Sequence, residues 1–278
     1  MDGQKGQVFL IVLMAMVIVF TVGLSIASRS IVTVRTTREE RDSQRALSAA
    51  ETGIERSLRT GTSISAPVAF SGDPGTKYTT SVDDVDGTQI LINGGNLIPK
   101  DEGADIWLVP HDSNNDPILV SPWNGNLRIY WGSASDVCDP SPAVNTMAAI
   151  EVAIVYDSDP SPVTEHTLTR AVYDPCGPPV NRRGNNSFVA AQNGIFTFGG
   201  ASFSHRTPLI NISSGFVIRV VPLYSSANMG VTSSNPLPSQ GTVVDSTGES
   251  YGTSRKIRVF RGFPSLPSQF FLYGLFSP

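Results

Sequence analysis

The pattern of hydrophobic positions divides the chain into a long apolar segment near the N-terminus and a longer region of short, alternating runs. Residues 8–27 include no charged side chain, and apolar residues occur on every face of the helix that this segment would form. A helix of that length spans roughly 30 Å, which is the thickness of a bilayer core. The segment therefore predicts a transmembrane helix rather than the buried helix of a soluble protein.

The residues that follow predict that this helix continues without a break. Between Ser28 and Thr60 the sequence contains no proline, and Gly53 is the only glycine. The apolar and amphipathic parts together predict one helix of about 52 residues, nearly 80 Å long, that ends before Gly61. The apolar positions near helical spacing in its second part are Ile31, Val34, Leu47, Ala50, Ile54 and Leu58.

A cleaved secretory signal peptide is the main alternative for the N-terminal segment. Ser25 and Ala27 offer a weak small-x-small cleavage site. A signal peptide, however, has a shorter apolar core and needs no helical continuation beyond it. We therefore favour a retained anchor.

Beyond residue 60 the pattern changes to short runs rich in β-branched and aromatic residues, separated by clusters of turn-forming residues. No second long helix is predicted. The expected fold class is α+β, with the N-terminal helix followed by a mainly antiparallel, sandwich-like β domain over residues 61–278. If this domain has two lobes, residues 175–186 are the weakest join. The predicted strands are 77–82, 89–92, 106–109, 118–120, 127–131, 148–156, 166–173, 216–223, 242–244, 256–260 and 270–275.

The two cysteines frame two of the strongest predicted strands, 148–156 and 166–173. If these strands pair as a hairpin, Cys138 and Cys176 fall near its open end, where side chains come within disulfide range. We predict a Cys138–Cys176 disulfide; two unrelated buried thiols are the alternative. Such a bridge suits an extracytoplasmic compartment and would contribute about 2–4 kcal/mol.

Candidate catalytic and metal-binding side chains are few, with two cysteines and three histidines in the chain. Residues 111–116 resemble the start of a calcium loop, but Pro117 stands where a glycine is expected, which favours an Asx-rich turn. Nucleophile-elbow and phosphate-loop motifs are absent from the sequence. We therefore predict no catalytic residue, no metal and no cofactor. Arg182 and Arg183 are expected to be solvated, and the aromatic stretch 263–278 to form a buried terminal strand.

The net charge of −4 gives no basis for predicting a specific nucleic-acid partner.

Four stretches of the first sixty or so residues resemble the type IV pilin superfamily, and more narrowly PilX-like minor pilins and the tip-type pseudopilins of type II secretion. They are residues 4–10 (Gln-Lys-Gly-Gln-Val-Phe-Leu), the apolar run, residues 38–41 (Arg-Glu-Glu-Arg) and residues 49–55 (Ala-Ala-Glu-Thr-Gly-Ile-Glu). The resemblance implies cleavage by a prepilin peptidase after Gly6, which leaves Gln7 as the new N-terminus. Residues 1–6 would then be the leader and 7–60 the pilin-like helix, with its transmembrane part at 8–27.

Two positions depart from the pattern of a major pilin. Ile11 stands where major pilins carry a glutamate five residues into the mature chain, and Gln7 replaces their usual N-terminal phenylalanine. Because tip-type members can lack the glutamate, the resemblance implies a minor or initiating subunit rather than the bulk subunit.

Charge and resemblance disagree on the orientation in the membrane. Arg29, Arg35, Arg38 and Arg41 follow the apolar run, so the positive-inside rule would place them in the cytoplasm. The pilin resemblance implies the reverse, with a cytoplasmic N-terminus and an extracytoplasmic β domain, and acidic residues accompany the arginines. We follow the resemblance and expect a single-pass membrane protein.

The function that the resemblance implies is structural, not enzymatic. The apolar helix would lie in the inner membrane and then pack in a filament core, and the partners would be membrane lipid, prepilin peptidase, other pilin subunits and an inner-membrane assembly platform. A membrane-anchored adhesin or DNA-uptake module is the main alternative, and an enzyme with two carboxylates in one cleft is a third. The expected anchor and core residues are Val8, Phe9, Leu10, Ile11, Leu13, Val17, Phe20 and Leu24.

Overall fold

The computed structural model describes residues 4–157, 166–267 and 271, and it divides the chain into two compact units. Unit 1 comprises residues 1–82 and 244–259, and unit 2 comprises residues 83–243 and 260–278. A long helix followed by mainly antiparallel sheet confirms the predicted α+β class. Residues 175–186, considered above as a join between lobes, lie inside unit 2.

The long helix α1 (Gln4–Thr60) is continuous over 57 residues, as the sequence pattern predicts. The helix ends at Gly61, which takes the left-handed conformation with a φ of 67°. The N–H of Gly61 donates to the carbonyl of Ser57 and caps the last turn. Roughly 85 Å of helix results from this length.

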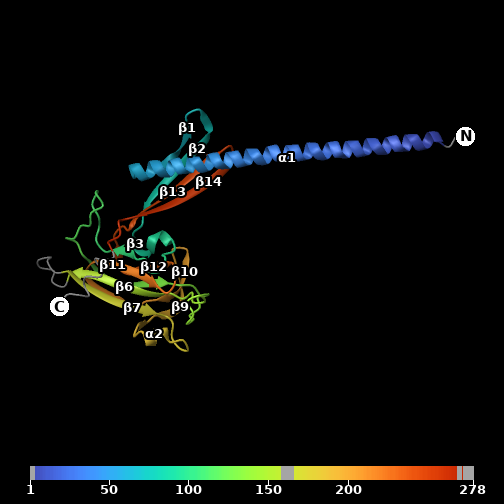
Figure 1. The fold of residues 1–278 in the computed structure, drawn as a ribbon. Coiled ribbons are helices and arrows are strands. Elements are labelled where there is room, and N and C mark those ends of the chain that lie inside the picture. Colours follow the sequence, from blue (N-terminus) through green and yellow to red (C-terminus); the bar gives the residue numbers. More distant parts are fainter. Residues whose placement is uncertain (1–3, 158–165, 268–270, 272–278) are drawn as a thin grey trace. The chain divides into compact units, whose positions relative to one another are not determined.

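The C-terminal part of α1 packs on a four-stranded sheet in unit 1 with the strand order β1-β2-β13-β14, in which β1 and β2 are antiparallel (Figure 1). Two hydrogen bonds tie the helix to β2: Ser57 Oγ to Thr80 Oγ1 at 2.6 Å and Arg56 Nη1 to Tyr78 Oη at 3.1 Å. Strand β1 was not predicted, whereas the other three contain predicted strands. The strands are β1 (Ile64–Phe70), β2 (Asp73–Asp84), β13 (Gly241–Ser250) and β14 (Thr253–Gly262).

Small residues form much of the face of α1 that meets this sheet, and two of the predicted apolar positions, Ala50 and Ile54, are buried there. Leu47 is exposed, whereas the fully buried helix positions include Ala46, Ala49 and Ala50. The reason is a close approach of backbone to backbone, since a Cβ added at Gly248 of β13 would lie 2.6 Å from the backbone nitrogen of Ala50. This approach leaves no space for a larger side chain at Gly248 or at the helix positions opposite it.

Replacing Gly248 with valine is therefore expected to destabilise unit 1. The new side chain would overlap the backbone of α1, and overpacking of this kind costs about 1–3 kcal/mol or more. Chemical denaturation of the micelle-bound chain would measure the free energy of unfolding. Glu249→Ala is the matched control, because Glu249 is the next residue of β13 and its one ion pair among the described residues is an exposed one with Lys77. Equal stability of the two variants would show that the helix does not dock at this strand.

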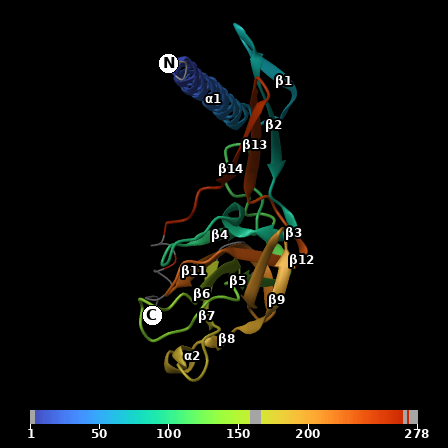
Figure 2. The ribbon, with the colours of Figure 1, turned by 90° about the vertical axis from the view of Figure 1, so that its right-hand side faces the viewer.

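Unit 2 is built on a ten-stranded sheet that branches at two strands. Figure 2 shows the layered strands of this unit. The main path of the sheet runs β3-β12-β5-β11-β6-β7-β8, while β4 pairs with β11 and the β9–β10 hairpin joins β5. Every pairing in it is antiparallel except the short β7–β8 contact. The elements are β3 (Gly87–Leu91), η1 (Ile92–Gly95), β4 (Ala104–Trp107), β5 (Trp123–Trp131), β6 (Ala149–Asp157), β7 (His166–Asp174), α2 (Arg182–Asn185), β8 (Val189–Ala190), β9 (Gln192–Phe198), β10 (Ala201–Arg206), β11 (Ile210–Leu223) and β12 (Met229–Leu237).

Two hydrophobic clusters lie on opposite faces of β4, β6 and β11. The larger takes alternate residues of these strands together with residues of β3, β5 and β12, and Trp131 is fully buried in it. The smaller takes the intervening residues, such as Trp107 and Val155, and is covered by the chain after β14 through Phe263, Leu266 and Phe271. Successive side chains of each strand therefore point alternately into the larger and the smaller cluster.

Several predicted strands differ from the structure. Residues 118–120 are not a strand: 119 and 120 lie in a turn, and the isolated bridge between His111 and Pro117 ends just before them. Strands β8, β9, β10 and β12 were not predicted. The terminal aromatic stretch packs on the smaller cluster as expected, but residues 263–267 do so without strand structure, and 268–270 and 272–278 lie outside the described residues.

Candidate functional site: an apolar helix and a cavity

The N-terminal part of α1 presents large apolar side chains to its surroundings along its whole circumference. Phe9 is 71% exposed and Phe20 is 72% exposed, and no surface formed by the described residues covers them. An 18-residue stretch of the described helix Phe9–Thr60 has a mean hydropathy of 2.8, and the helix is long and apolar enough to cross a membrane. The predicted anchor positions that the structure shows exposed are Phe9, Leu10, Ile11, Leu13, Val17, Phe20 and Leu24.

The predicted leader-cleavage residues, Gly6 and Gln7, lie in the first turns of α1. For these two residues and for Val8, the structure describes only the helical backbone. Residues 1–3 of the expected leader lie outside the described residues.

The predicted disulfide between Cys138 and Cys176 is confirmed, with the two Cα atoms 5.8 Å apart. The hairpin argument behind it also holds, because β6 and β7 pair in antiparallel register with Ile150 opposite Tyr173. The bridge fastens the loop before β6 to the end of β7 and thereby closes this end of unit 2.

Arg182 is not the solvated loop residue that the sequence suggested. Its guanidinium forms a two-pronged ion pair with the buried carboxylate of Asp174, with both nitrogen–oxygen distances at 2.8 Å. The same guanidinium donates to Asn145 Oδ1 and to the carbonyl of Met147. Asp174 also accepts the N–H of Cys176, so the ion pair and the disulfide fasten the same loop.

The acidic loop at residues 111–116 forms the expected Asx turn. The carboxylate of Asp112 accepts the backbone N–H of Asn114 at 2.8 Å and that of Asp116 at 2.9 Å. These bonds hold the pKa of Asp112 below its usual value. His111 points the other way and stacks on Phe263 with ring centroids 3.8 Å apart, and burial lowers the pKa of its imidazole. Within the described part of the chain, no three His, Cys, Asp or Glu side chains gather as a metal site.

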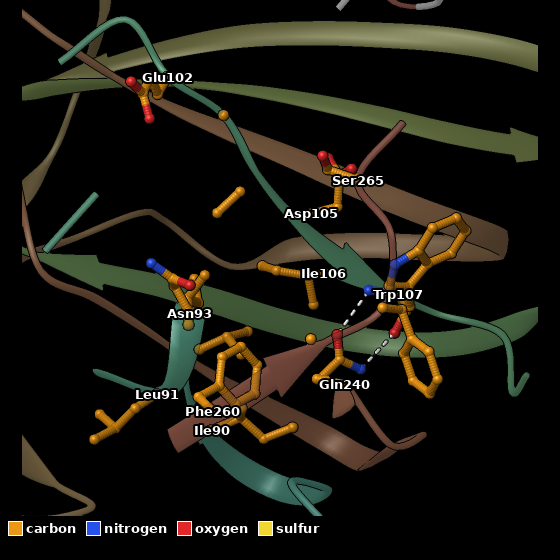
Figure 3. Close-up of a pocket in the computed structure, with 16 residues that line it drawn as sticks. Ile90, Leu91, Asn93, Glu102, Asp105, Ile106, Trp107, Gln240, Phe260 and Ser265 are labelled. Atoms are coloured by element: carbon orange, nitrogen blue, oxygen red, sulfur yellow. Dashed lines mark hydrogen bonds between the residues drawn. The ribbon is translucent and has the colours of Figure 1, made fainter. Parts of the chain in front are cut away.

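A cavity of about 370 Å³ lies in unit 2 between β3, β4 and the chain after β14 (Figure 3). Its volume falls in the range of roughly 300–1,000 Å³ that is typical of small-ligand pockets. Nothing in the sequence pattern indicated it. The residues of its apolar wall include Ile90, Ile92, Ile106, Val231 and Phe260, and its polar residues are Asn93, Glu102, Asp105, Gln240 and Ser265.

The carboxylates of Asp105 and Glu102 line this cavity. Asp105 interacts with neighbouring groups of the protein. Asp105 Oδ2 accepts the N–H of Leu266 at 2.7 Å, and its Oδ1 lies 3.7 Å from Arg219 Nη1. Burial raises the pKa of Asp105, and the Leu266 N–H and the Arg219 charge oppose that shift. Glu102 is exposed and forms no ion pair with any described residue.

Comparisons with known proteins give no relative: no family model, no curated protein and no solved structure matches the chain.

Proposed function

We propose that the chain is a pilin-like minor subunit of a type IV pilus or of a related filament or secretion system. The observation that carries this proposal is the two-part helix α1. Its first part is apolar and exposed all round, and its second part docks through small residues on the four-stranded sheet of the same unit.

The exposed part of α1 needs a covering environment, because a continuous apolar surface of this size is unfavourable in water. Membrane lipid supplies that cover to a single subunit, and the helices of other pilin subunits supply it in a filament core. A helix that is apolar all round suits both environments, because neither requires a polar face. The chain performs no reaction in this proposal, and an inner-membrane assembly platform moves it from one environment to the other.

The confirmed disulfide supports an orientation with unit 2 outside the cytoplasm, since disulfides persist in oxidising compartments. The N-terminus would then lie on the cytoplasmic side, within reach of a prepilin peptidase. Ile11 adds no buried charge to the apolar part of the helix, which fits a minor subunit better than a bulk one.

Mass spectrometry of the protein from its own host tests the processing step. We expect a mature chain that begins at Gln7, because Gly6 is the small residue before the proposed scissile bond. A host that lacks the prepilin peptidase should yield the unprocessed chain. The substitution Gly6→Leu should also block processing, because its bulk does not fit where the small residue is required.

Two results would contradict the proposal. An intact leader in the presence of the peptidase would identify α1 as a permanent tether. A cut near Ala27 would identify the apolar segment as a signal peptide. Fractionation of cells with and without the assembly machinery completes the test, since the subunit should reach the sheared surface fraction only when that machinery is present.

A further inference from the structure

Strand β4 has one paired edge and one open edge. Its residues Ala104–Trp107 pair with β11 along one side, with Ile106 opposite Ile218. In the part of the chain that the structure describes, no strand pairs with β4 on the other side, and the cavity lies along that side. An unpaired strand edge is a template for another extended segment.

The side chain of Gln240 already occupies one end of this edge in the way that a neighbouring strand would. Its Oε1 accepts the N–H of Trp107 at 2.7 Å, and its Nε2 donates to the carbonyl of Trp107 at 2.8 Å (Figure 3). Both backbone groups of Trp107 therefore point away from β11. The N–H of Leu108, one residue further on, points back to β11 and donates to Phe216.

The alternation of an antiparallel ladder then fixes the direction of the next open groups. Asp105 lies two residues before Trp107, so its N–H and carbonyl also point away from β11. Among the described residues, no backbone group bonds to either of them. These two groups face the cavity with their hydrogen-bonding capacity open.

The walls of the cavity indicate the side chains that would accompany such a segment. Ile90, Val231 and Phe260 form an apolar surface suited to a β-branched or aliphatic side chain. At the Asp105 end, the carboxylate of Glu102 has no cationic partner among the described residues, while the charge of Asp105 is offset by Arg219. The uncompensated charge at the site is thus negative, and it favours a basic side chain in the occupant.

We propose that this cavity binds an extended peptide from a partner protein by strand addition to β4, with its backbone paired to Asp105, an aliphatic side chain in the cavity and a basic side chain beside Glu102. Main-chain hydrogen bonds supply the affinity in this mode of recognition, and the cavity supplies the choice of side chain. The site lies within unit 2 and does not depend on the filament proposal.

Calorimetric titration of the full-length chain in neutral detergent micelles tests this assignment. The probe is a pentapeptide with blocked ends that alternates lysine and valine. We expect saturable binding with a 1:1 stoichiometry, accompanied by a change in tryptophan fluorescence because Trp107 lines the cavity. The same peptide N-methylated at every residue should bind at least about tenfold more weakly, because it cannot donate to the carbonyl of Asp105.

Two charge-reversed variants locate the site. Glu102→Lys should weaken binding of the lysine–valine peptide by about tenfold, since it places like charges together. Asp86→Lys is the matched control, because Asp86 is another exposed acid of unit 2 and does not line the cavity. Circular dichroism of both variants checks that unit 2 keeps its sheet.

Three outcomes would overturn the assignment. Absence of saturable binding removes the site, and equal affinity for the N-methylated peptide removes strand addition. Self-association of the chain that the peptide competes away would assign the open edge to a second copy instead of a partner peptide.

Discussion

The double substitution Val17→Asp/Phe20→Asp is expected to remove the chain from the membrane fraction. Both side chains are exposed near the middle of the apolar part of α1, so lipid would surround them. An aspartate at the centre of a membrane helix costs about 2.5–3.5 kcal/mol, whereas each large apolar residue contributes only a few tenths of a kcal/mol in favour of insertion. Two such charges on neighbouring turns offset most of what the remaining apolar residues contribute.

Membrane flotation measures the result directly, with Val17→Leu/Phe20→Leu as the matched control that keeps the segment apolar. The disulfide gives a second readout. A chain that fails to insert stays in the cytoplasm, so Cys138 and Cys176 should remain reduced in the charged variant and oxidised in the control. A charged variant that still floats with membranes and carries the disulfide would contradict the role of α1 as a membrane anchor.

The long helix could be predicted because its signals are local. An uncharged run, the absence of proline and a terminal glycine act within a few residues of each other, and tertiary contacts add nothing to them. The face that docks on the sheet could be predicted only in part, at Ala50 and Ile54. It depends on Gly248, about 200 residues away, which admits the alanine positions of α1 and leaves Leu47 outside.

The β region shows the same limit. Residues 118–120 carry strong strand propensity, but no described strand lies beside them to pair with, so they do not form a strand. Strand β12 was missed because Ser, Asn and Pro at 233–236 suggest a loop, whereas its pairing with β3 and β5 decides its conformation. The cavity beside the open edge of β4 is formed by segments distant in sequence, such as β4 and Gln240. No local sequence pattern indicates that these segments meet.

Arg182, which the sequence suggested to be solvated, forms an ion pair with the buried Asp174. Its replacement is therefore expected to cause the largest loss of stability in unit 2. Replacing Arg182 with methionine is expected to destabilise unit 2 by about 3–5 kcal/mol, because the carboxylate of Asp174 would remain fully buried without its cation. The change also removes the donors to Asn145 and Met147, so the loop that carries Cys138 loses its second attachment.

Denaturant unfolding followed by tryptophan fluorescence measures this loss, since Trp131 is buried in the larger cluster of unit 2. Arg183→Met is the matched control, because Arg183 is the adjacent arginine and takes no part in the ion pair. The double variant Asp174→Asn/Arg182→Met should recover part of the loss, because a buried neutral amide is less costly than a buried unpaired charge. If Arg182→Met and Arg183→Met are equally stable, the ion pair does not hold this end of the unit, and the disulfide alone fastens the loop.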